Sequence, residues 1–324
     1  MKKLVIAAVL ASAPFAAQAA DMPSKAKKAA PVAHVTEASV LNFDGFVGGE
    51  IGYQSTSHGF DYGAGNQDMG NDKGLNLNVH GSFETMLSSQ YGLQMDAALN
   101  RTTHDFGTIQ GQDLNYSTMV PTIAGHVFWR DSSKGLVGVF AQSTTTDNLL
   151  IGTVATGYTY AGVEGQYFMN GFTAYGQVAY LSASIPGASL VGDVKGDGYA
   201  LAAQLRYFVD PNLMIALRGS YTQASYQYAG VTLADNSTSV VGLRAEYRLP
   251  NNPASLYADV SYNMNKIDAS SSEGVKLSMD DARVMFGLNL NLGGKSLLER
   301  DRSGASLSTI DAPTTAVSPN TPQT

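Results

Sequence analysis

The 324-residue chain contains no cysteine, only one tryptophan and few charged residues, which make up 15% of the sequence. Without cysteine, disulfides cannot hold the fold together. Beyond residue 20 there is no run of 18 apolar residues, which excludes a membrane-spanning helix. The formal net charge of -7 argues against sequence-independent binding to nucleic acid. We therefore expect no nucleic-acid partner.

Motifs for catalysis and metal binding are also missing. The stretch GGKS at 293–296 is not a phosphate-binding loop, because that motif requires glycine where this chain has Asn289. The five histidines are scattered and lack the spacing of metal ligands. The sequence therefore predicts neither a cofactor nor a metal site, and no enzymatic activity.

The N-terminus has the three parts of a secretory signal peptide. Lys2 and Lys3 form a basic start, residues 4–11 are apolar, and Ala17-Gln18-Ala19 is a cleavage signal. We expect residues 1–19 to be removed on export.

Two further segments are poor in large apolar residues. Residues 20–41 are rich in Ala, Lys and Pro, and residues 294–324 end in a low-complexity stretch. Such segments bury too little surface to offset the entropy of ordering. They are predicted to be a disordered periplasmic linker and a disordered periplasmic tail on either side of a domain at 42–293.

Alternation with period two dominates that domain. In 199–207 every second residue from Tyr199 is apolar and the opposite face ends in Arg206. After the turn sequence Asp210-Pro211-Asn212, residues 213–221 alternate again, with Arg218 on the polar face. Period two is typical of β-strands, so 199–221 is predicted to be a hairpin whose two arginines share one side.

About twelve such segments occur, with ten to fourteen as the range left open. Short turn-like connectors alternate with longer polar ones, as in barrels with short periplasmic turns and long extracellular loops. The predicted strands are 43–54, 74–84, 90–101, 118–129, 135–145, 152–168, 172–182, 198–208, 213–225, 238–249, 254–265 and 281–292.

The two faces of these strands favour a membrane barrel over a soluble sandwich. Aromatic residues such as Tyr199 and Tyr207 lie near both ends of the apolar faces, as expected of two interfacial girdles. The opposite faces carry charges at mid-strand that a dry core would not accommodate. The fold class is therefore predicted to be all-β: a transmembrane, antiparallel, up-and-down β-barrel with a wet interior.

In these respects the sequence resembles the outer-membrane, porin-like β-barrels of Gram-negative bacteria. The start FDGFVGGEIGY and the close GLNLNLGGKSLLERDRSGASL are similar to alphaproteobacterial members. The resemblance implies the cell outer membrane as location, lipid and lipopolysaccharide as surroundings, and leaves a homo-oligomer open. One departure is the missing C-terminal aromatic residue, for which FGLNLNL at 286–292 is the internal substitute.

Charged residues on the polar faces separate along the chain into two groups. In a closed cylinder these groups form opposite walls of the lumen, and the resulting field would select polar solutes. An internal ion-pair network that closes the barrel is the other interpretation. The acidic wall is predicted to be Glu50, Glu84, Asp96 and Glu164, and the basic wall Arg206, Arg218, Arg244, Arg248 and Arg283.

The function predicted from these features is a passive diffusion channel for small polar solutes or ions. The alternative is a closed-lumen barrel with a structural or surface-interaction role. A more distant alternative rests on His80 and Ser82, which are two residues apart on a strand, as in outer-membrane phospholipases. Their alternation with Val79 and Phe83 predicts that both point into the lumen rather than toward lipid.

Overall fold

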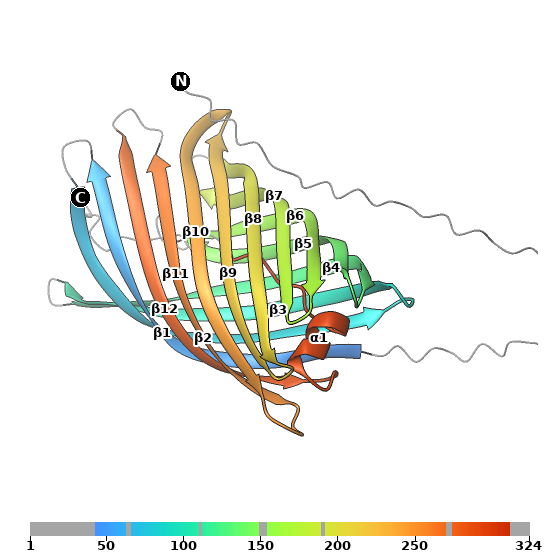
Figure 1. The fold of residues 1–324 in the computed structure, drawn as a ribbon. Coiled ribbons are helices and arrows are strands. Elements are labelled where there is room, and N and C mark those ends of the chain that lie inside the picture. The colour runs from blue at the N-terminus through green and yellow to red at the C-terminus, as the bar shows by residue number, and fades with distance from the viewer. Residues whose placement is uncertain are drawn as a thin grey trace, which may run out of the picture. The chain divides into compact units, whose positions relative to one another are not determined.

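The computed structural model describes residues 43–62, 66–109, 112–148, 154–188, 192–269 and 274–311. They form a closed barrel in which each strand pairs antiparallel with its neighbours in sequence, and β1 pairs with β12 to close the ring (Figure 1). The strands are β1 (Phe43–Tyr62), β2 (Asn66–Met86), β3 (Tyr91–Ile109), β4 (Gln112–Asp131), β5 (Gly135–Asn148), β6 (Val154–Met169), β7 (Phe172–Ala188), β8 (Gly192–Asp210), β9 (Leu213–Tyr228), β10 (Val231–Arg248), β11 (Ala254–Ala269) and β12 (Val275–Asn291).

The alternation read from the sequence is the alternation of the barrel wall. Tyr199 and Leu205 face outward and are 41% and 44% exposed, whereas Arg206 faces inward and is 6% exposed. The outward face of every strand carries exposed aliphatic or aromatic side chains. Because closure pairs the backbone of all strands and leaves no sheet edge, this apolar surface suits a lipid environment. The predicted fold class and strand number are confirmed.

Outward-facing aromatic residues gather near both ends of the wall. Phe172 and Tyr207 lie opposite each other on β7 and β8, with ring centroids 4.5 Å apart. Eight residues further along β8 from Tyr207, Tyr199 pairs in register with Tyr180 and lies 6.0 Å from the ring of Tyr221. Two levels of rings on the apolar surface are typical of the interfacial girdles of membrane barrels.

The longer connectors differ from the prediction, because most of their residues continue the strands. The expected loop at 55–73 is strand up to Tyr62 and again from Asn66, and that at 226–237 is a turn at Ala229 and Gly230. These stretches lack the apolar face that marks a lipid-exposed strand. Backbone pairing does not need that face, so the ladders extend beyond the apolar band.

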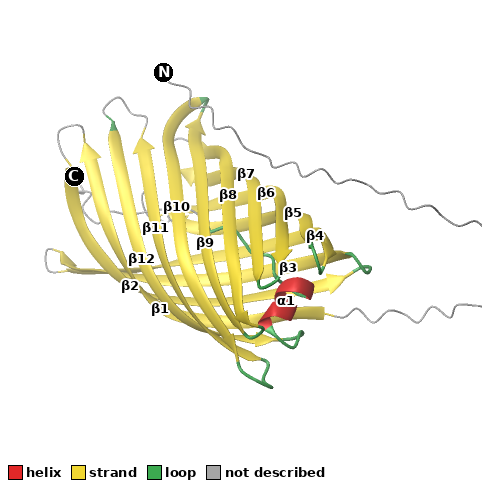
Figure 2. Cartoon of the chain, viewed as in Figure 1, coloured by secondary structure: helices red, strands yellow, loops and turns green. Residues whose placement is uncertain are grey.

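The C-terminal region also differs from the prediction. Of the expected tail at 294–324, residues 297–303 form the helix α1 (Leu297–Ser303), drawn in red in Figure 2, and residues 304–310 continue from it as an extended segment. Leu307 and Ile310 are buried. A core of its own is unnecessary for this segment, because the barrel interior supplies one. The signal peptide at 1–19, the linker at 20–41 and the tail residues 312–324 lie outside the described residues.

The α1 helix lies at the rim formed by the short turns. Its Leu298 amide donates to the carbonyl of Pro211 in the β8–β9 turn, and Arg302 donates to the carbonyl of Asn170 in the β6–β7 turn. Among the described residues no helix is long and apolar enough to cross a membrane. The extended segment therefore starts at the short-turn rim.

The orientation of β8 predicts the outcome of thiol labelling. The chain has no native cysteine, so single cysteines at Ala203, which faces outward, and at Gln204, which lines the lumen, are unambiguous probes. In lipid vesicles a charged, water-soluble thiol reagent should react faster at 204 than at 203. Equal rates in detergent-denatured protein serve as the control, and faster reaction at 203 in vesicles would invert the register.

Candidate functional site: the occupied lumen

The segment 304–311, hereafter the luminal segment, climbs the inner wall from the short-turn rim. Its start is near the rim, where Arg130 on β4 donates to the carbonyl of Gly304 at 2.9 Å. Its end reaches Gln142, seven residues into β5 from Gly135. At about 3.3 Å per residue and a tilt of about 40°, this is a climb of about 18 Å. The luminal segment thus occupies the lumen from the rim toward mid-barrel.

Glutamine side chains from four neighbouring strands hold the main chain of the luminal segment. Gln94 on β3 accepts from the amides of Ser306 and Leu307, at 3.1 Å each, and donates to the carbonyl of Leu307. Gln142 on β5 accepts from the amide of Ile310 at 2.8 Å and donates to its carbonyl at 2.7 Å. Each of these two amides pairs with a peptide group on both of its atoms, as a neighbouring strand would.

Two further glutamines continue this row. Gln166 on β6 donates to the carbonyl of Ser306 at 3.1 Å, and Gln177 on β7 donates to the carbonyl of Ser308 at 2.8 Å. The hydroxyl of Tyr175 on β7 accepts from the amide of Ser308 at 3.2 Å. All four glutamines are buried. They are hereafter called the glutamine row: Gln94, Gln142, Gln166 and Gln177.

A buried acid–histidine–acid chain lies behind the glutamine row. His126 on β4 contacts Asp96 through Nε2 and Glu164 through Nδ1, at 2.8 Å each. Carboxylates accept hydrogen bonds, so this geometry is satisfied when both ring nitrogens carry a proton. Asp96 also accepts from Gln94, and Glu164 accepts from the hydroxyl of Tyr175 at 2.8 Å. The chain thereby orients two of the side chains that hold the luminal segment.

Ion pairs fix the base of the segment. Arg300 of α1 donates to both carboxylate oxygens of Glu246 on β10, at 3.1 Å each. Arg206 on β8 pairs with Asp301 at 2.6 Å and also donates to the carbonyl of Ser306. All of these charged groups are buried, so each depends on its partner.

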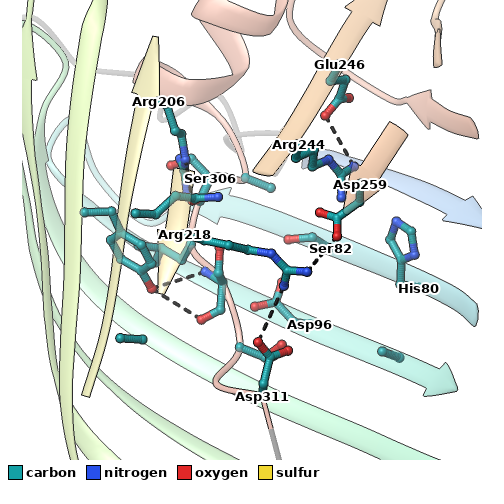
Figure 3. Close-up of a pocket in the computed structure, with 18 of the residues that line it drawn as sticks. His80, Ser82, Asp96, Arg206, Arg218, Arg244, Glu246, Asp259, Ser306 and Asp311 are labelled. Carbon is teal, nitrogen blue, oxygen red and sulfur yellow. Dashed lines mark hydrogen bonds and ion pairs between the residues drawn. The ribbon is translucent and has the colours of Figure 1, made fainter. Parts of the chain in front are cut away.

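An open cavity of about 350 Å³ remains beside the luminal segment. It is lined by the segment itself and by inward-facing residues of β1–β3 and β7–β12. Figure 3 shows Arg218 reaching across it between Asp259 on β11, at 2.8 Å, and Asp311 of the segment, at 3.5 Å. Arg244 lies 3.6 Å from the ring centroid of Tyr257 and 3.4 Å from Glu246. The cavity is therefore polar, with charges of both signs on its walls.

Every residue of the two predicted walls faces the lumen, but the signs are mixed. Among the expected acids, Glu84 pairs with Arg130, and Asp96 and Glu164 are bridged by His126. Within the basic group the partners are acids on the same side or in the C-terminal region. Arg248 contacts the carbonyls of Asn252 and Gly293, Arg283 contacts Asp281, and Glu50 accepts from Asn78.

The His80–Ser82 pair points into the cavity, as the alternation predicted (Figure 3). The Nε2 atom of His80 lies 3.0 Å from Oδ1 of Asn289 on β12. Its hydrogen bond thus joins two strands of the wall on opposite sides of β1.

Several residues at this site had not been singled out from the sequence: Arg130, His126, the glutamine row, Arg300, Asp301 and Asp311. One signal for the helix is present, since Ser296-Leu297-Leu298-Glu299 has the spacing of an N-terminal cap. In the structure the Ser296 hydroxyl accepts from the Glu299 amide at 3.1 Å. The glutamines gave no signal, because inward polar residues are common in any barrel wall.

Comparison with known proteins supports the fold. No family model and no curated protein matches the chain. Among solved structures, an outer-membrane channel from Pseudomonas putida F1 is similar, with a TM-score of 0.54, 11% identity, and coverage of 82% of this chain and 100% of that chain. A FadL homologue from Pseudomonas aeruginosa matches at a TM-score of 0.40 and 10% identity, over 76% of this chain and 90% of that chain. The chain has the fold of an outer-membrane β-barrel, as the sequence resemblance implied; an alphaproteobacterial origin stays a prediction.

The buried pair of Arg300 and Glu246 predicts a large stability effect. Replacing Arg300 by Met leaves the buried Glu246 without its strongest partner and should lower the free energy of unfolding by about 3 kcal/mol. Urea unfolding in detergent, followed by heat-modifiable migration on a gel, would measure it. Lys134→Met is the control, since Lys134 forms an exposed pair with Asp131 in the β4–β5 turn. Equal midpoints for the two variants would contradict the structural role of Arg300.

Proposed function

We propose that the protein is an outer-membrane channel for the passive diffusion of small polar solutes or ions. The observation that carries this proposal is the polar cavity left beside the luminal segment. Lipid and lipopolysaccharide would surround the apolar outer wall. The solved channel from Pseudomonas putida F1 shares the fold, which is consistent with a channel.

Charges of both signs along the cavity suit a solute that is polar without a large net charge. Arg244 and Arg283 on one side and Glu50 on the other all line it. Water in a narrow, partly desolvated passage screens fixed charges less than bulk salt does, so these residues would set ion preference. The solute would cross the lumen between the luminal segment and the wall of β8–β12.

A closed barrel with a structural or surface-interaction role is the second candidate. It is favoured by the luminal segment, which fills one side of the lumen through main-chain hydrogen bonds and the buried pairs of Arg206 and Arg300. Conductance separates the two candidates.

Unitary current in a planar bilayer tests the proposal. The full chain should give discrete steps above leak. In Arg244→Gln/Arg283→Gln, removing two fixed positive charges should shift the reversal potential in a salt gradient toward cation preference. Stability should change little, because Glu246 keeps Arg300 and Asp281 keeps a hydrogen bond from Asn263.

Lys134→Gln removes a positive charge from an exposed turn outside the lumen and should leave the reversal potential unchanged. Absence of unitary current from the folded full chain would reject the channel in favour of the closed barrel. Current without any shift in the double variant would place the conducting path elsewhere in the lumen.

A further inference from the structure

We infer that the inner wall of β3–β7 is a binding site for an extended peptide, with the luminal segment as its resident ligand. When that segment leaves, the same wall takes another peptide of the same chemistry from the short-turn rim. The inference does not depend on conduction, because it concerns the wall and the segment alone.

Recognition at this wall is directed at the peptide main chain. The amides of Ser306, Leu307, Ser308 and Ile310 and the carbonyls of Gly304, Ser306, Leu307, Ser308 and Ile310 all contact wall side chains. Peptide groups are common to every sequence. A site built on them binds by strand-like pairing and takes its specificity from side-chain pockets.

Two apolar pockets provide that specificity. Leu307 packs with Phe128, Leu136 and Tyr175. Three residues later, Ile310 packs in a cluster that includes Phe140 and Tyr160. Ala305 and Ser306 between α1 and the first pocket are also buried, which requires small residues there.

Charge completes the description of the ligand. Arg218 faces Asp311, directly after the second pocket. The ligand class is therefore an extended peptide with small residues first, aliphatic side chains at two positions three apart, and an acid directly after the second.

The wall is prepared for this ligand before it binds. Gln94 is held by Asp96, and Tyr175 and Gln177 are held by Glu164, at 2.9, 2.8 and 3.3 Å respectively. Because these bonds are within the barrel, they orient the donors without help from the peptide. Preorganised donors reduce the entropy lost on binding.

The resident segment competes with any added peptide. It is joined to β12 through α1, so its effective concentration at the wall is on the order of millimolar. A peptide in trans at micromolar concentration is therefore excluded until the resident segment is weakened. Leu307→Asp/Ile310→Asp places two carboxylates in the apolar pockets and releases the segment in the full-length chain.

Fluorescence anisotropy of a labelled RSGASLSTID peptide, residues 302–311, tests the site in detergent. The peptide should bind the released variant saturably and the unaltered chain at least tenfold more weakly. A peptide with Asp in place of its Leu and Ile should lose most of the binding to the released variant. Each variant is first shown to be folded by heat-modifiable migration on a gel.

Two glutamine variants in the released background separate specific binding from adhesion. Gln142→Leu removes both bonds to Ile310 and should weaken peptide binding about tenfold. Gln54→Leu removes an equally buried lumen glutamine that bonds Asn76 and Thr56, and should leave binding unchanged. Absence of saturable binding to the folded released variant, or equal loss in both glutamine variants, would overturn the inference.

Discussion

Closure of the sheet is the constraint on which the rest of this molecule depends. Every strand finds a partner on both sides, and the pair of β1 with β12 removes the last open edge. Once the ring is closed, side chains have two destinations, and period two assigns each residue to one of them. Aliphatic and aromatic residues cover the outside, and the inside receives the charges. No disulfide is needed, because the continuous hydrogen-bond ladder already holds each strand in place.

The second consequence of closure is an interior with more polar groups than its own walls can satisfy. Arg206 and Glu246 have partners that come from α1, over fifty residues further along the chain. Gln94 and Gln142 are satisfied by peptide groups. The C-terminal region is therefore part of the interior in an energetic sense, since removing it would leave buried polar atoms to water alone. The cavity on the other side of the lumen is where water or solute takes the place of protein partners.

The sequence was sufficient for the wall and insufficient for its contents. Alternation placed Tyr199 outside and Arg206 inside, and twelve alternating segments became twelve strands, because lipid enforces a strict division between the two faces. The extensions of β1 and β2 beyond the apolar band carried no such division and were taken for loops. The residues around Ser306 resembled a tail because their bonds are made by peptide groups, which no side-chain pattern reveals. The partnership of Arg218 with Asp311 spans 93 residues and follows from three-dimensional closure.

The place of α1 and the luminal segment in the chain has a consequence for assembly. Both follow β12, the strand that closes the ring, and their contacts come from β3 at one side and from β9 and β10 at the other. That binding site is complete only after β12 has joined β1. Seating of the segment is accordingly the last event of biogenesis, and a newly closed barrel passes through a stage in which its interior is vacant. Retention of the segment thus marks a barrel that has finished folding.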